Sequence, residues 1–166
     1  MALSPLYGRV CAFVAIDDSG TLWKSCIQNE SDEDEVNVIE TLFRTIAGKR
    51  AVSYNGNGFD LPFLYRRAVI LGINPGEFGL PVLSAMTERK SKFHIDIMNA
   101  WCGFGQFEKL DNLARAILND QKNDIDFKDF PELIKSEEGR DTILAYCAQD
   151  VALTMKLWNR IDGILV

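Results

Sequence analysis

The sequence predicts an α/β fold in which a mixed sheet is flanked by helices, and three observations carry the prediction. Continuous apolar runs typical of buried strands occupy residues 9–16 and 49–54. Apolar residues recur at helical spacing from residue 59 to residue 71, directly after the second run. Along the whole chain the expected elements follow the order ββαβαβαα, whose alternating second half indicates a sheet covered by helices.

The N-terminal region is expected to form a hairpin followed by a helix. After the first strand, an Asp-Asp-Ser-Gly turn leads into a less apolar returning strand at residues 21–28. The acidic run at residues 30–35 is expected to be a solvated loop. A helix with one apolar face is expected over residues 34–47, and Gly48 ends it.

Residues 72–92 contain no regular element that the sequence predicts, and a segment of that length in a compact domain is often functional. The segment carries Arg89, Lys90 and Lys92, the densest basic cluster of the chain. This cluster fits either a solvated loop or a contact with a phosphate backbone, and the sequence leaves both interpretations open.

The rest of the chain is expected to be mostly helical. A strand at residues 93–98, with alternate isoleucines on one face, precedes an amphipathic helix around residues 110–117. Residues 119–130 are acidic and irregular in pattern. A short helix at residues 131–135 and a long helix over residues 140–161 complete the chain.

Composition limits the classes of function. The 166 residues suit one domain, residues 1–166, and the 47% hydrophobic and 25% charged residues are ordinary for a globular protein. No apolar run reaches the length of a membrane span, so no membrane partner is expected. The four cysteines lack CxxC spacing and histidine occurs once, which disfavours a zinc site and fits reduced thiols in the cytoplasm. The net charge of −6 argues against a broad nucleic-acid-binding surface, but the carboxylate-lined metal site of a nuclease is itself negative.

Residues 53–60, with the sequence SYNGNGFD, join the second apolar strand to the helix that follows it. Glycine and asparagine tolerate the tight backbone that such a connection needs. Asp60 is therefore expected at a helix N-terminus beside the carboxyl end of a strand, where open α/β sheets tend to place their sites. Taken alone, the stretch favours a simple capping role for this carboxylate.

A second carboxylate changes that interpretation. Tyr146 and Asp150 are four residues apart in the last expected helix and so share one face. SYNGNGFDLPFLYRRA at residues 53–68 resembles the second motif, and YCAQD at residues 146–150 the third, of the DEDD-superfamily 3′–5′ exonucleases that have a tyrosine in the third motif. Over roughly residues 2–162, the chain is similar to predicted exonucleases related to the proofreading domain of family B DNA polymerases.

This resemblance implies a ribonuclease-H-like fold and hydrolysis of a terminal phosphodiester with two divalent cations, Mg²⁺ or Mn²⁺. It implies that Asp60 and Asp150 either bind the metal or support its ligands, and that Tyr146 orients the attacking water. It also implies that Asn55 hydrogen-bonds to the terminal nucleotide and that Phe59 stacks on it. The expected partner is nucleic acid, in particular the 3′ end of single-stranded DNA.

The family's first motif, Asp-x-Glu at the end of a first central strand, is absent from this sequence. Asp17 and Asp18 are the nearest acidic pair, but adjacent side chains of an extended backbone point apart, and the pair stands in a turn. The chain is therefore expected to be an N-terminally incomplete domain without the first central strand, with weak or no exonuclease activity. The missing strand would leave an empty position in the sheet, between the hairpin and the strand at residues 49–54. This position is expected to be closed by direct pairing of the strands on its two sides or by a strand from another chain, and either favours a homodimer.

Several other residues have two interpretations. His94 is expected to pack or hydrogen-bond near a strand end, and Asp96 to support the site or a turn. Trp101 and Phe104 fit base stacking or core packing, whereas Cys147 is expected to be buried and inert. The main alternative function is a non-catalytic nuclease-fold remnant that binds nucleic acid or a protein partner. An unrelated α/β binding domain agrees poorly with the paired motifs.

Overall fold

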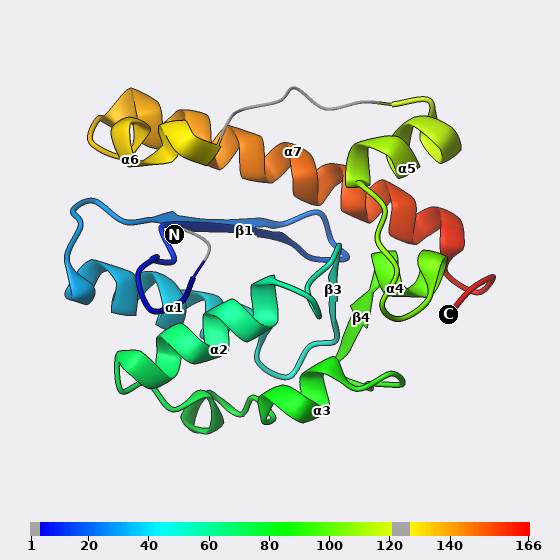
Figure 1. The fold of residues 1–166 in the computed structure, drawn as a ribbon, viewed down its shortest axis with the longest axis horizontal. Coiled ribbons are helices and arrows are strands. Elements are labelled where there is room, and N and C mark those ends of the chain that lie inside the picture. Colours follow the sequence, from blue (N-terminus) through cyan, green and yellow to red (C-terminus); the bar gives the residue numbers. More distant parts are fainter. Residues whose placement is uncertain (1–3, 121–126) are drawn as a thin grey trace.

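A computed structural model describes residues 4–120 and 127–166 and shows two small β-sheets packed among helices (Figure 1). The long C-terminal helix covers one side of the strands, and two shorter helices lie on the other side. No helix in these two ranges is long and apolar enough to cross a lipid bilayer. The arrangement agrees with the mixed α/β fold expected from the sequence.

The first sheet is a β-hairpin. β1 (Ala12–Ile16) pairs antiparallel with β2 (Leu22–Cys26). Asp17 closes the connecting turn, because its Oδ1 accepts hydrogen bonds from the N–H groups of Ser19 and Thr21, both at 3.0 Å. The acidic residue that follows β1 is therefore part of the turn, as its Ser-Gly context indicated.

The second sheet is parallel. β3 (Ala51–Ser53) pairs with β4 (His94–Asp96), and α2 (Asp60–Ile70) follows β3 along the chain. Within the described part of the chain, neither strand is hydrogen-bonded to the hairpin. Direct pairing of the hairpin with β3, one of the two expected ways to close the sheet, therefore does not occur among the described residues.

β4 is shorter than the strand expected at residues 93–98, because Ile97 begins a helix, α4 (Ile97–Cys102). The Asp96 carboxylate ends the strand and caps the helix by accepting a hydrogen bond from Asn99 N–H at 3.3 Å. The prediction of alternating isoleucines on one strand face is wrong, since Ile97 packs from the helix into the core.

α7 (Glu137–Ile161) joins the two sheets into one structure, because it packs against both β1 and β3. Near its start, Ile143 lies in a hydrophobic cluster with Phe13 of β1. Near its end, Leu157 lies in a second cluster with Ile97 of α4. The helix begins with a Ser136 cap and is three residues longer at its start than the helix expected at residues 140–161.

α1 (Asp32–Ile46) and α2 lie side by side on the face opposite α7 (Figure 1). Ile39 and Phe43 of α1 pack against Leu64 and Ala68 of α2 in a third hydrophobic cluster. Both helices fall where apolar spacing predicted them, although α1 starts two residues earlier than expected.

The remaining segments correct and complete the expected order. Residues 72–92, expected to lack regular structure, contain a 3₁₀ helix (Pro75–Phe78) and α3 (Leu83–Thr87). Asn74 and Pro75 begin the former in the usual way for a capped helix start. The helices expected near residues 110–117 and 131–135 are α5 (Leu110–Leu118) and α6 (Phe130–Leu133). The irregular stretch expected at residues 119–130 includes residues 121–126, which lie outside the described residues, and a 3₁₀ turn (Phe127–Asp129).

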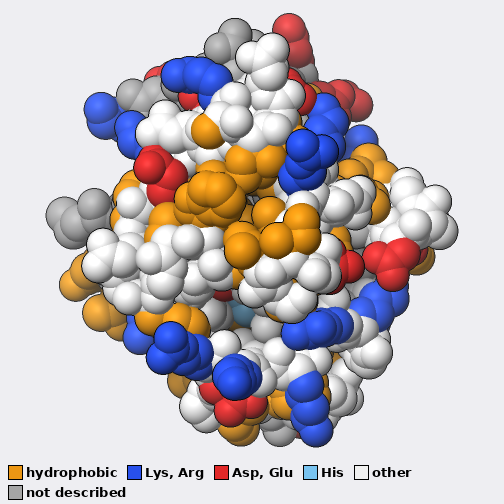
Figure 2. All heavy atoms as spheres, turned by 90° about the vertical axis from the view of Figure 1, so that its right-hand side faces the viewer, with side chains coloured by type: hydrophobic (Ala, Val, Ile, Leu, Met, Phe, Trp, Pro, Cys, Tyr) orange, Lys and Arg blue, Asp and Glu red, His pale blue; other side chains and the backbone are white. Residues whose placement is uncertain are grey.

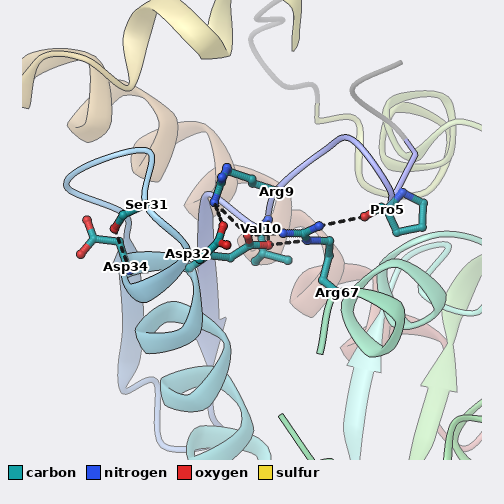
Figure 3. A network of polar contacts seen from close by, with 8 residues as sticks. Pro5, Arg9, Val10, Ser31, Asp32, Asp34 and Arg67 are labelled. Carbon is teal, nitrogen blue, oxygen red and sulfur yellow. Dashed lines mark hydrogen bonds and ion pairs between the residues drawn. The ribbon is translucent and has the colours of Figure 1, made fainter. Parts of the chain in front are cut away.

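Glu35 overturns the prediction of a solvated acidic loop at residues 30–35. α1 begins at Asp32, and Glu35 is 0% exposed. Its carboxylate accepts hydrogen bonds from Arg67 Nε at 2.8 Å and Nη2 at 2.6 Å, and from Val10 N–H at 2.9 Å (Figure 3). A buried ion pair thus connects α1, α2 and the segment before β1.

Candidate functional site

The loop between β3 and α2 has a tightly constrained backbone. Asn55 has a φ of 62°, a left-handed conformation that asparagine tolerates better than most residues. At Gly56, a Cβ atom would overlap Ser53 Oγ and lie 3.1 Å from His94 Nε2. The asparagine and glycine of this loop therefore allow the sharp turn and the close approach to β4 that larger residues would prevent.

Two buried side chains of β4 hold this loop in place. The Asp96 carboxylate accepts hydrogen bonds from Asn55 N–H at 3.0 Å and from Asn57 N–H at 2.9 Å. The His94 ring lies with Nε2 2.8 Å from Ser53 Oγ and Nδ1 3.1 Å from Asn57 Oδ1. Burial lowers the pKa of His94. The prediction that His94 hydrogen-bonds near a strand end is confirmed, and Asp96 supports the loop from its buried side.

The end of this loop presents an aromatic ring and a carboxylate. Phe59 occupies the N-cap position of α2 without a side-chain cap hydrogen bond, and Asp60 is the first residue of the helix. Phe59 is 37% exposed, and its ring centroid lies 5.6 Å from that of Phe63. The two residues that the sequence singled out here are therefore accessible from solvent.

Asp60 interacts electrostatically with two other carboxylates. Loss of hydration raises the pKa of Asp60 to about 6, and the negative charges of Asp96 and Asp150 raise it further, against a hydrogen bond from its own backbone. Part of the Asp60 residue nevertheless stays exposed at the surface. The charges of two carboxylates, one on β4 and one on α7, thus act on Asp60 although they are far from it in the sequence.

α7 supplies the remaining residues that the sequence predicted. Asp150 is half-buried, and Tyr146 lies one helical turn before it and is 6% exposed. The Tyr146 ring stands edge-on to the ring of Phe130 in α6, with centroids 6.2 Å apart. Between the two, burial raises the pKa of the Cys147 thiol to about 12, and the charges of Asp150 and Asp60 contribute to the increase. Cys147 is therefore an unreactive thiol, as expected.

Asp60 and Asp150 would offer a divalent cation fewer ligands than a two-metal centre needs. Their carboxylates have the hard oxygen atoms that Mg²⁺ and Mn²⁺ prefer, and Mg²⁺ commonly uses one or two carboxylates and several waters. Both Asp96 oxygens already accept backbone hydrogen bonds. Of the residues described, no three His, Cys, Asp or Glu side chains converge closely enough to hold a metal. A two-metal centre requires further carboxylates to bridge its ions.

Comparison with known proteins identifies the family. A family described as "Predicted 3'-5' exonuclease related to the exonuclease domain of PolB" matches residues 4–164. The chain belongs to this family. The similarity recognised in the two sequence motifs is thereby confirmed for nearly the whole chain of this PolB-exonuclease-related protein.

Relatives of this exonuclease-family chain are DNA polymerases. It is 31% identical over 153 residues to the DNA polymerase catalytic subunit of Epstein-Barr virus (strain B95-8), covering 78% of this chain and 15% of the viral protein. It is 27% identical over 146 residues to DNA polymerase 1 of Sulfolobus acidocaldarius, covering 81% of this chain and 16% of the polymerase. The chain thus spans less than a fifth of the length of these relatives.

The fold of the exonuclease-family chain matches a solved polymerase. The family B DNA polymerase from Pyrobaculum calidifontis superposes with a TM-score of 0.77 at 22% identity, covering 95% of this chain and 22% of the polymerase. This similarity confirms the ribonuclease-H-like α/β fold that the resemblance implied.

The sequence predicted the roles of some residues near the site only in part. It left Asp96 open between a role in the site and a role in a turn, and it gave no separate indication for Ser53. Both take part in the network that holds the β3–α2 loop. The sequence indicated these roles weakly, because Ser53 and Asn55 bond to His94 and Asp96, which lie 41 positions further along the chain.

Proposed function

We propose that this chain is a 3′–5′ exonuclease-like domain that acts on nucleic acid, in particular DNA, and that its own activity is weak or absent. The observation that carries the proposal is that Phe59 and Asp60 stand exposed at the end of the β3–α2 loop, where the charge of Asp150 on α7 also acts on Asp60. Membership in a family related to the PolB exonuclease domain supports the chemistry, and the polymerase relatives support DNA as the substrate.

In this proposal, Asp60 and Asp150 hold a divalent cation, Mg²⁺ or Mn²⁺, which supplies charge stabilisation at the scissile phosphate when it is bound. Tyr146 orients the water that attacks the terminal phosphodiester. The 3′-terminal nucleotide of a single strand hydrogen-bonds to Asn55 and stacks on Phe59. The exposed position of Phe59 at the end of the β3–α2 loop supports the stacking role.

Weak activity is expected because few of the described carboxylates can bind the catalytic cations. The third carboxylate of the group, Asp96, is engaged by the backbone N–H groups of Asn55, Asn57 and Asn99. Releasing it to bind a metal would leave buried donors without an acceptor, at a cost of about 1–3 kcal/mol for each group. Asp96 therefore contributes by holding the loop, which leaves Asp60 and Asp150, of the described carboxylates in this group, to bind a cation.

A cleavage assay tests the proposal. The purified chain is incubated with Mn²⁺ and a single-stranded oligonucleotide that carries a fluorophore at its 5′ end, and the product ladder is followed over hours. We expect slow shortening from the 3′ end at most, and Asp150→Ala abolishes whatever shortening is seen. Rapid digestion would contradict the claim of weak activity. Shortening that Asp60→Ala and Asp150→Ala both leave unchanged would contradict the assigned site.

A non-catalytic remnant is the second candidate, favoured by the incomplete donor set. Paramagnetic broadening by Mn²⁺ distinguishes the two hypotheses. If the site binds a cation, the NMR signals of residues near Asp60 and Asp150 disappear at stoichiometric Mn²⁺ in the unaltered protein and remain in the variants Asp60→Asn and Asp150→Asn. A remnant shows no such selective broadening and yet binds an oligonucleotide or a protein.

We also propose that another polypeptide strand pairs with the open edge of one of the small sheets. In the described residues β1 pairs only with β2, and β3 only with β4. A homodimer that exchanges a strand is one solution to these open edges. Light scattering coupled to size-exclusion chromatography checks this directly: a mass near 37 kDa, twice that of the 18.7 kDa chain, supports the dimer, and a monomeric mass argues against it.

A further inference from the structure

Three aromatic residues are exposed between residues 101 and 107, at the end of α4 and in the loop after it. Trp101 is 48% exposed, Phe104 45% and Phe107 67%. Large aromatic rings contribute most to stability when they are buried. A group of exposed rings on one short segment therefore indicates a binding surface for a ligand or a partner molecule.

A cation from a different segment lies beside one of these rings. The guanidinium carbon of Arg89 is 5.6 Å from the centroid of the Phe104 ring, so the segment between α3 and β4 contacts the loop after α4. Lys90 and Lys92 are exposed on the same segment. Figure 2 shows the side of the molecule that lies at the right of Figure 1, where α4 is drawn, with hydrophobic side chains gathered at its centre and lysine and arginine side chains around them. We call these six residues the aromatic–basic patch: Arg89, Lys90, Lys92, Trp101, Phe104 and Phe107.

The patch adjoins the candidate site. Tyr54, the residue before Asn55, donates a hydrogen bond from its hydroxyl to the backbone carbonyl of Glu108 at 2.8 Å. Burial raises the pKa of Tyr54, so the hydroxyl keeps the proton that it donates. This bond ties the segment that carries Phe104 and Phe107 directly to the start of the β3–α2 loop.

We infer that the aromatic–basic patch binds single-stranded nucleic acid a few nucleotides away from the end that is held at Asn55 and Phe59. This inference rests on the proposed function of the site. Successive bases stack on exposed aromatic rings, and lysine and arginine neutralise the phosphates between them.

Charge complementarity favours this ligand over a protein partner. The chain as a whole has a net charge of −6, yet three cations occur within residues 89–92, and one of them, Arg89, lies over the exposed Phe104 ring. An apolar protein interface has no need of such a cluster, since charged residues are depleted at interface cores. The sequence left the basic cluster open between solvated loop and phosphate contact, and its contact with Phe104 favours the second.

Fluorescence anisotropy of a 5′-labelled dT12 oligonucleotide tests the inference. The whole chain is titrated in the presence of EDTA, so that binding is measured without cleavage. Phe107→Ala is expected to weaken binding on the order of tenfold. Lys90→Glu weakens it strongly, whereas Lys24→Glu, an equal change of net charge on exposed β2, changes it little. Circular dichroism verifies that each variant remains folded.

The salt dependence of binding separates phosphate contacts from stacking. Three phosphate contacts predict a slope of log affinity against log salt concentration of about −2 for a single strand. Lys90→Ala with Lys92→Ala should make the slope shallower by about 1.4, whereas Trp101→Ala with Phe107→Ala should weaken binding and leave the slope unchanged.

Three results would overturn the inference: no measurable binding at low salt, equal effects of Lys90→Glu and Lys24→Glu, or a slope that the double lysine variant leaves unchanged. If Phe107→Ala altered only the association state of the protein, the patch would be a protein interface instead. The nuclease proposal is judged separately by Mn²⁺-dependent cleavage. Loss of cleavage in Asp60→Ala, with oligonucleotide binding in EDTA intact, would leave the patch assignment standing. Unchanged oligonucleotide binding in Lys90→Glu, with Mn²⁺-dependent cleavage by the unaltered chain, would reject the patch alone.

Discussion

Removing the Glu35 carboxylate is expected to destabilise the protein severely. Glu35 is fully buried, and the Arg67 side chain that it pairs with is only 6% exposed. Glu35→Ala leaves this guanidinium in the interior without a counterion and the Val10 N–H without its acceptor. Breaking a buried ion pair by removing one partner typically costs about 3–5 kcal/mol. For a chain of this size, that loss lowers the melting temperature by roughly 6–20 °C.

A double variant and a surface control make this test specific. Replacing both partners, as in Glu35→Met with Arg67→Met, removes both charges, so the double variant is expected to be no less stable than either single variant. The pair Arg44–Glu40 has a similar distance, 2.7 Å, but its side chains are 62% and 30% exposed. Glu40→Ala should therefore cost less than about 0.5 kcal/mol.

Urea unfolding followed by tryptophan fluorescence and by circular dichroism gives the free energies, provided that the two probes coincide. The reasoning fails if Glu35→Ala is as mild as Glu40→Ala. It also fails if the losses of unfolding free energy in Glu35→Met and Arg67→Met add up in the double variant. Additivity would mean that the two side chains do not stabilise each other.

Three further predictions follow from local geometry. Gly139→Ala places a Cβ against the backbone carbonyl of Leu133, so it should destabilise the protein by about 1–3 kcal/mol in thermal unfolding, whereas the exposed neighbour variant Glu138→Ala should not. Hydrogen bonds from Ser19 and its surroundings lower the pKa of Asp17 to about 2, so the turn stabilises the fold above about pH 4 and loses this contribution as the pH falls toward 2. In Ser19→Ala, the NMR titration midpoint of Asp17 should rise toward 3.8, and an unchanged midpoint would contradict the assigned bond. The four cysteine thiols are partly buried and all have raised pKa values, so iodoacetamide at pH 8 should label the native protein much more slowly than the urea-unfolded chain, and equal rates would contradict these pKa shifts.

Much of the fold could be predicted because local sequence determines it. The helical spacing of Leu64 and Ala68 placed α2, and the apolar run before Asp17 placed β1. The glycines and asparagines of residues 53–60 identified the strand-to-helix connection, since few other residues accept a left-handed or closely approached backbone. These features depend on a residue and its near neighbours, so a single chain is enough to show them.

Polar residues were predicted less well because their environment is set by distant parts of the chain. Glu35 lies three and four residues before Val38 and Ile39, on the same helix face, and that spacing was a usable signal of burial. Its acidic neighbours suggested a solvated loop instead. The partner that makes burial possible, Arg67, is 32 residues away.

The sequence by itself determined where most of the strands and helices fall, and it showed that Asp60, Tyr146 and Asp150 stand in stretches that resemble exonuclease motifs. Only the tertiary structure decided which acidic residues are buried, which backbone groups Asp96 binds, and which cations lie beside the exposed rings of residues 101–107. The reason is that the hydration and the charge interactions of a side chain depend on every group within a few ångströms, and folding brings most of those groups from elsewhere in the chain.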